Sequence, residues 1–269
     1  MVRERSTVIG GRTTRWLEAG GANAARTLVW LHAFPLGAEM WQPQLQSVPD
    51  GCRVVAPDLA GFGGTADHNG RPSIDDFAHD LDDLAHHLGL RHFVLGGLSM
   101  GGYAVFAYLR LNPSRLKGIV LADTKSGADT PQARDGRQKM LDLVASKGVA
   151  GVADEMVPKL LGATTQRANP ELVAKVRAMI EANGAEGVSR SIQRLRDRPD
   201  ATPQLARAAI PALVIVGEED GITPVAEARS MANALPEATL AVLPRAGHLS
   251  NLEAPDAFQA ALWPWLTGL

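Results

Sequence analysis

Residues Phe93 to Tyr108 read FVLGGLSMGGYAVFAY. Three residues that favour strands lead into two glycines, and an apolar segment with helical spacing follows, so the stretch predicts a strand, a sharp turn and a helix. Within it, Gly97, Ser99 and Gly101 form Gly-x-Ser-x-Gly, a pattern in which a strained turn lifts a serine hydroxyl clear of the sheet. Side chains at the two glycines would collide with the neighbouring strand and helix. Because a chain with 27 glycines can match this pattern by chance, its support has to come from the rest of the sequence.

Further apolar runs along the chain predict the other strands of a sheet. Each run is continuous rather than alternating, as expected of a strand buried on both faces. The runs are Thr27–Leu31, Arg53–Ala56, Leu116–Ala122, Ala212–Gly217 and Thr239–Leu243. Helical spacing occurs between them, in a short stretch from Trp41 to Leu45 and in an amphipathic segment from Ile74 to Leu88.

The order of these segments predicts the fold class. Residues 5–18 alternate loosely around Gly10 and Gly11, which indicates a hairpin at a sheet edge. Strands that alternate with helices are typical of a mostly parallel sheet with helices on both faces. We therefore expect an α/β fold, with a mostly parallel central sheet flanked by helices.

The alternation of strands and helices stops between Lys125 and Ala209. Apolar residues recur there at helical spacing, with breaks at Gly162, Pro170, Gly184 and Pro199. We interpret residues 125–209 as a helical cap inserted into a core made of residues 1–124 and 210–269. The cap is expected over the carboxyl edge of the sheet, where open α/β sheets have their active sites.

Length, charge and cysteine content exclude several classes of protein. A chain of 269 residues suits one α/β core with an insertion, and a net charge of −2 gives no electrostatic reason to expect nucleic acid or an anionic membrane as a partner. The single cysteine, Cys52, cannot form an internal disulfide, and residues 1–10 lack an apolar signal segment. No window approaches the roughly 18 apolar residues of a membrane span. A cytoplasmic protein is expected, and its oligomeric state is left open.

A serine hydroxyl becomes a nucleophile when a base takes its proton, and a histidine base needs a carboxylate to orient it. His248 is the one histidine downstream of Ser99, and it directly follows the last predicted strand. Asp220 lies just after the strand Ala212–Gly217, where a carboxylate could reach the second imidazole nitrogen. These residues predict a catalytic triad of Ser99, Asp220 and His248.

With this order of serine, acid and histidine, the chain resembles the α/β-hydrolase family along nearly its whole length. His32–Pro35 is similar to the family's oxyanion loop, usually His-Gly-x-Pro, with Ala33 in place of the glycine. Asp58–Thr65 is similar to its Asp-x-x-Gly-x-Gly-x-Ser segment, and Thr223-Pro224 after the acid also matches. The most similar subgroup is that of small carboxylesterases and enol-lactonases. The resemblance implies an oxyanion hole formed by the backbone N–H groups of Phe34 and Met100.

Other residues compete for these roles. Glu218, Glu219 and Asp123 are alternatives to Asp220, although we expect Asp123 to cap the entry to the insertion. His32 precedes the serine and is expected to hold the oxyanion loop by hydrogen bonds.

Two further groups of polar residues could bind a ligand, but we interpret both as solvent-exposed surface. A metal site could be built from His79, Asp82, Asp83, His86 and His87, but these lie opposite the apolar face of their predicted helix. The cap arginines could hold a substrate carboxylate, but nearby acids nearly balance them; they include Arg134, Arg137, Arg190, Arg194 and Arg196. Because no phosphate-binding glycine loop is present either, we expect neither a metal nor a cofactor.

The resemblance and the triad together predict a serine hydrolase that acts on small carboxylic esters. Residues flanking the catalytic loops are expected to form a mainly apolar pocket: Phe34, Leu36, Trp41, Met100, Ile222 and Leu249. An enol-lactonase, a metal-free perhydrolase or haloperoxidase and a carbon-carbon bond hydrolase would share the triad, so they remain alternatives. A ligand-binding receptor on a hydrolase scaffold is the alternative outside the enzymes.

Overall fold

The computed structural model describes residues 1–269 and contains an eight-stranded sheet in the order β1-β2-β4-β3-β5-β6-β7-β8. The hairpin β1–β2 is antiparallel, β2 also pairs with β4 in antiparallel fashion, and the other five pairings are parallel. This confirms the predicted α/β class. The strands are β1 (Arg3–Ile9), β2 (Arg12–Gly20), β3 (Arg26–Leu31), β4 (Cys52–Pro57), β5 (Phe93–Leu98), β6 (Leu116–Ala122), β7 (Ala212–Gly217) and β8 (Ala238–Leu243).

Strand bounds agree with the apolar runs of the sequence. The predicted ranges of β6 and β7 match the observed ones at both ends, and the β1–β2 turn falls at Gly10 and Gly11, both of which have positive φ. Positive φ favours glycine, so the sequence marks this turn clearly.

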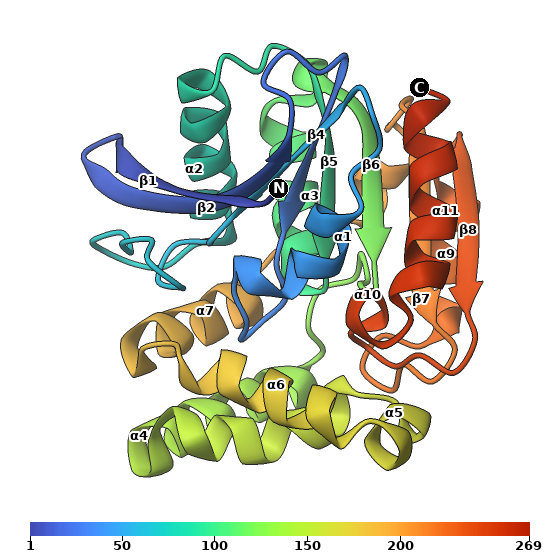
Figure 1. The fold of residues 1–269 in the computed structure, drawn as a ribbon. Helices are drawn as coiled ribbons and strands as arrows, with labels where there is room; N and C mark the ends of the chain where they lie inside the picture. Colours follow the sequence, from blue (N-terminus) through green and yellow to red (C-terminus); the bar gives the residue numbers. More distant parts are fainter.

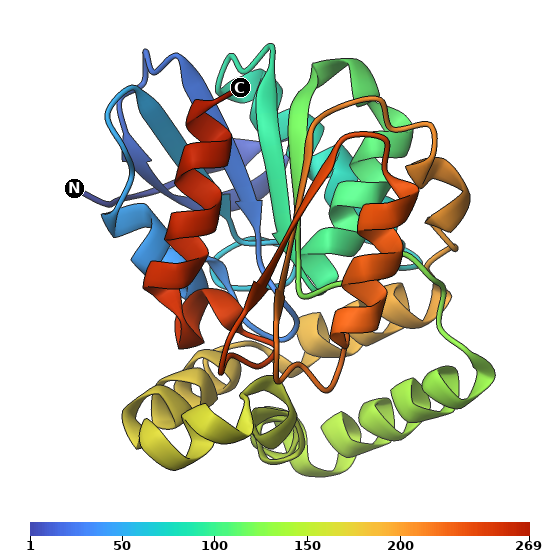
Figure 2. The ribbon, with the colours of Figure 1, turned by 90° about the vertical axis from the view of Figure 1, so that its right-hand side faces the viewer.

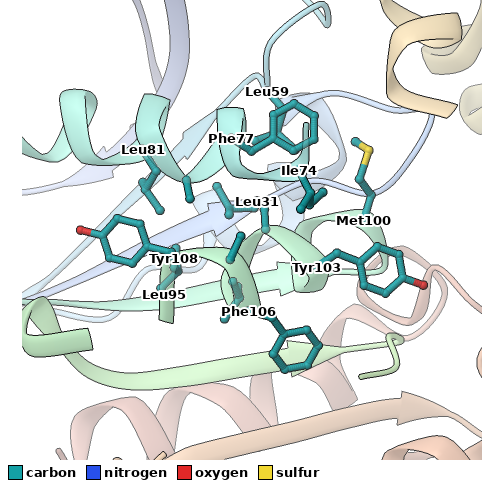
Figure 3. Close-up of a cluster of buried hydrophobic side chains, with 14 of the residues drawn as sticks. Leu31, Leu59, Ile74, Phe77, Leu81, Leu95, Met100, Tyr103, Phe106 and Tyr108 are labelled. Atoms are coloured by element: carbon teal, nitrogen blue, oxygen red, sulfur yellow. The ribbon is translucent and has the colours of Figure 1, made fainter. Parts of the chain in front are cut away.

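Helices cover the sheet on both sides and divide the core into two layers. The first layer packs α2 (Ile74–His87), α3 (Met100–Leu111) and α9 (Val225–Ala234) on one face. The second packs α1 (Gln42–Gln46) and α11 (Pro255–Thr267) on the other. Figure 3 shows part of the first layer, where side chains of α2 and α3 come together above the sheet.

Alternation along a single strand explains why both layers are apolar. In β3, Val29 and Leu31 point into the first layer, whereas Leu28 and Trp30 point into the second. Each strand of the parallel part therefore needs apolar residues at nearly every position, which is why those runs are continuous in the sequence.

Four helices between β6 and β7, which we call the cap helices, lie together below the sheet in both ribbon views (Figures 1 and 2). They are α4 (Pro131–Leu160), α5 (Ala163–Ala168), α6 (Pro170–Glu181) and α7 (Ala185–Asp197). A short α8 (Thr202–Leu205) returns the chain to β7. Helix α4 is kinked at Gly148, where φ is 65°. None of the helices is both long enough and apolar enough to cross a membrane.

One cap arginine, Arg194, is fully buried, whereas Arg134 is exposed as expected. Arg194 on α7 has no exposed side-chain surface; it forms ion pairs with Asp67 and Asp76 and lies over the ring of Phe77. Arg190 also binds Asp67. The interpretation of Arg194 as a surface residue is therefore wrong, because its charge is compensated by Asp67 and Asp76 and not by contact with water.

Candidate active site

Ser99 lies between β5 and α3 in a strained backbone conformation, with φ 55° and ψ −111°. Its N–H donates to the carbonyl of Ala122 on β6 at 3.0 Å, which fixes the turn to the sheet. A Cβ atom on Gly97 would lie 2.2 Å from the Gly101 carbonyl, and one on Gly101 would lie 2.1 Å from the Leu31 oxygen. The flanking glycines are thus required by close backbone packing, as the sequence argument expected.

Two backbone donors near this turn are free. Met100 is the first residue of α3, where N–H groups have no partner in the preceding turn. Phe34 lies after the end of β3, and the hydrogen bonds of its loop leave its N–H unused. Both residues are buried, so water competes little for these donors.

His248 and Asp220 form a buried hydrogen-bonded pair. Nδ1 of His248 donates to Oδ2 of Asp220 at 2.8 Å, and both side chains are almost completely buried. The hydrogen bonds of His248 involve Nδ1 alone, so Nε2 remains available as a base. The structure brings these two residues together and leaves a hydrogen bond between His248 and Ser99 unmade. Such bonds often tighten only when a substrate binds.

Four donors hold the Asp220 carboxylate. The N–H groups of Ile222 and Thr223 donate to Oδ1 at 2.8 and 2.9 Å, and the Thr223 hydroxyl donates to Oδ2 beside His248 at 2.7 Å. Burial acts to raise the pKa of Asp220, but the charge of His248 and these hydrogen bonds outweigh it and lower the pKa. The carboxylate is therefore kept ionised next to the imidazole.

The competing acids have other partners. Glu219 accepts from the N–H and the hydroxyl of Thr164 in the cap, and Glu218 accepts from the N–H of Arg245. Neither is hydrogen-bonded to His248.

Asp123 was predicted to cap the insertion, and this is wrong, because Thr130 caps α4. Asp123 is instead fully buried, and it accepts from the N–H of Gly217 at 2.8 Å and from the hydroxyl of Ser250. Burial and the nearby charge of Asp220 raise the pKa of Asp123 well above its usual value. Asp123 directly follows β6, and its two hydrogen bonds connect the end of β7 with the segment just after His248.

His32 organises the oxyanion loop. Its Nε2 accepts from the N–H of Leu59 at 2.9 Å, so Nδ1 carries the proton and donates to the Ala33 carbonyl at 3.0 Å. Burial lowers the pKa of His32 and keeps it neutral. Ala33 is not among the residues with positive φ, so this loop accepts alanine in place of the family's glycine without strain.

The predicted pocket residues divide into two groups. Trp41 is fully buried, and its ring stacks on Trp30 at 4.1 Å between centroids. Leu36 and Leu249 have no exposed surface, whereas Ile222 is 36% exposed. A lining role for all four residues stays a prediction.

The candidate metal ligands of the sequence, from His79 to His87, lie on α2 and do not form a metal site. Across residues 1–269, no group of three or more histidine, cysteine, aspartate and glutamate side chains is arranged to hold a metal ion.

Comparisons with known proteins show the family and the fold. The family model of the alpha/beta hydrolase fold matches residues 26–255. Over 236 residues the chain is 30% identical to 3-oxoadipate enol-lactonase 2 of Acinetobacter baylyi, covering 87% of this chain and 86% of the relative. A thermophilic esterase from Thermogutta terrifontis, solved with malate bound, is 36% identical with a TM-score of 0.92, covering 99% of this chain and 98% of the other. An enol-lactonase from Burkholderia xenovorans shares the fold, with a TM-score of 0.89 at 24% identity over 98% of this chain and all of the other.

Proposed function

The chain belongs to the α/β-hydrolase fold family, and from this premise we propose that it is a serine carboxylesterase that cleaves small carboxylic esters through an acyl-enzyme. The observation that carries the proposal is the buried pair of Asp220 and His248, which leaves Nε2 of the imidazole free, together with the strained turn that presents Ser99. Esterase and lactonase relatives support a hydrolase of this general kind.

In the proposed first step, Ser99 attacks the ester carbonyl while Nε2 of His248 takes the hydroxyl proton. The free N–H groups of Phe34 and Met100 would then donate to the developing oxyanion. Each such donor is worth about 3 kcal/mol in the transition state. Ionised Asp220 fixes the Nδ1–H tautomer of the neutral imidazole and stabilises the imidazolium that forms.

In the second step, His248 returns its proton to the leaving alcohol, and the acyl group stays on Ser99. Water then attacks the acyl carbon while His248 takes a proton from it, and His248 passes this proton to the Ser99 oxygen as the acyl bond breaks and the acid is released. We propose that residues 125–209 act as a cap that limits access of water and substrate to this site.

Small, uncharged acyl groups are proposed as substrates, because the oxyanion loop and the elbow contribute mainly apolar side chains. The test is hydrolysis of p-nitrophenyl esters from acetate to octanoate by the parent, by Ser99→Ala and by Ser114→Ala, an exposed serine that serves as the matched control. Activity lost in the first variant and kept in the second, with a burst equal to the enzyme concentration, supports the acyl-enzyme route. Equal rates in the parent and Ser99→Ala, or no labelling of Ser99 by a fluorophosphonate, would overturn it.

An enol-lactonase is the second candidate, because the 3-oxoadipate enol-lactonase relative covers most of the chain at 30% identity. Turnover of a charged lactone without turnover of acetate or butyrate esters would favour this reading over the carboxylesterase.

A further inference from the structure

The carboxylate of Glu253, on α10 (Ser250–Glu253), lies between the cap and the loop of His248. Its Oε2 accepts from the N–H of Gly162 at 2.8 Å, and its Oε1 accepts from the N–H of Leu249 at 3.2 Å. Leu249 directly follows His248. No lysine, arginine or histidine pairs with Glu253, so its oxygens are used by backbone donors from two segments about 90 residues apart.

Other contacts bring the same two segments together. The N–H of Leu249 also donates to the carbonyl of Leu160, at the end of α4, at 3.1 Å. A Cβ atom on Gly247 would lie 2.2 Å from the nitrogen of Gly162, so the two backbones touch directly. Gly247 precedes His248, and Gly162 joins α4 to α5. The contact therefore connects the loop of His248 to the junction between two cap helices.

We propose that Glu253 is a positioning residue for His248, which it holds in register with the cap segment Leu160–Gly162. This inference rests on the proposed function. Glu253 does not touch the reacting atoms; it fixes the N–H of Leu249 and through it the backbone that carries the imidazole. If the histidine loop is loosened, the site still binds substrate, but the imidazole of His248 is less often in the orientation that lets it take the proton of Ser99.

The chemistry of the side chain explains why glutamate and not glutamine suits this position. A carboxylate offers two acceptor oxygens and no donor, which matches two converging N–H groups. In glutamine one of the two groups becomes an NH2, which cannot accept from the N–H group that it faces. Glu253→Gln is therefore a nearly isosteric change that removes one of the two bonds.

The test compares Glu253→Gln with Glu155→Gln, an exposed glutamate on α4 that pairs with Lys159. For p-nitrophenyl butyrate, kcat is calculated per active site, with the active sites counted from the amplitude of the burst, so that misfolded protein is not included. We expect Glu253→Gln to lower kcat roughly tenfold with KM within twofold, since small misplacements of catalytic groups mainly slow the chemical step. Glu155→Gln should leave both constants unchanged. A kcat of Glu253→Gln equal to that of the parent would overturn the proposal.

Hydrogen-deuterium exchange of the same proteins separates this inference from the proposed function. Faster exchange in both peptides, residues 160–164 and residues 247–253, supports the link between cap and histidine loop even if the parent hydrolyses no ester. Faster exchange in the cap peptide alone, or in neither, would overturn it.

Discussion

Nδ1 of His248 lies 2.8 Å from Oδ2 of Asp220, although 28 residues separate them in the chain. The contact forms because β7 and β8 are parallel neighbours, so the loops that follow them meet at the same sheet edge. Backbone bonds strengthen this meeting, since the N–H of Glu219 donates to the carbonyl of Ala246 at 2.7 Å.

Asp220→Asn should lower kcat by roughly 10³ to 10⁴ with little change in fold, because the amide would no longer hold the Nδ1–H tautomer that leaves Nε2 free. Ester hydrolysis measures this. The matched control is Glu218→Gln, which changes an exposed acid two residues away. A similar loss in the control, or none in Asp220→Asn, would contradict the assignment of the acid.

Replacing Asp123 by asparagine should stabilise the protein more at higher pH. The folded state raises the pKa of this carboxyl well above 3.8, so the folded state binds more protons than the unfolded state in the window above 3.8. Stability of the parent therefore falls as the pH rises through that window, and the asparagine variant lacks this loss. Melting temperatures from about pH 4 to pH 8 should show the difference, variant minus parent, growing with pH. A difference independent of pH would show that Asp123 does not titrate in this way.

His32→Leu should lower both activity and stability. Loss of the acceptor for the N–H of Leu59 costs about 1 to 3 kcal/mol, and the loosened oxyanion loop should reduce kcat. Because burial lowers the pKa of His32 below 6.5, the parent loses stability as the pH falls below 6.5, and the variant lacks that loss. The gap in unfolding free energy should therefore shrink at acid pH. Exposed His92→Leu is the control, and an equal effect there would refute the role of His32.

Arg194→Met should lower the free energy of unfolding by about 3 kcal/mol, because it leaves the partly buried acids Asp67 and Asp76 with less compensating charge. Arg196→Met, on the same helix, removes a more exposed pair with Asp197 and should change it by less than about 1 kcal/mol. Urea unfolding of both variants decides between a cap held by a buried ion pair and one held by apolar packing alone. Equal losses would favour the second view.

The sequence predicts the sheet well, because continuous apolar runs and positive-φ glycines are local signals. β6 and β7 follow from such runs, and the turn at Ser99 follows from glycines whose absent side chains the packing requires. The contact between Asp220 and His248 was also predictable, because both residues follow strands and parallel strands bring their carboxyl ends together.

The sequence does not reveal which residues that are distant in the chain come into contact in the interior. Trp41 lies close to His32–Pro35 in the chain, yet it faces the second core layer, where it ends the short 3-10 helix Ala38–Trp41 and stacks on Trp30. Arg194 looks like a surface residue until Asp67 and Asp76 are placed against it. Asp123 has no periodic signal at all, and only the three-dimensional meeting of β6, β7 and α10 gives it partners.

The direct contact between Gly162 and Gly247 limits how freely this scaffold can be rebuilt. A different set of helices grafted between β6 and β7 to change substrate preference would have to bring the backbone past Gly247 with no side chain in the way. The inserted segment and the loop of His248 would therefore have to be redesigned together, and a graft that ignores this contact would displace the histidine as well as change the substrate preference.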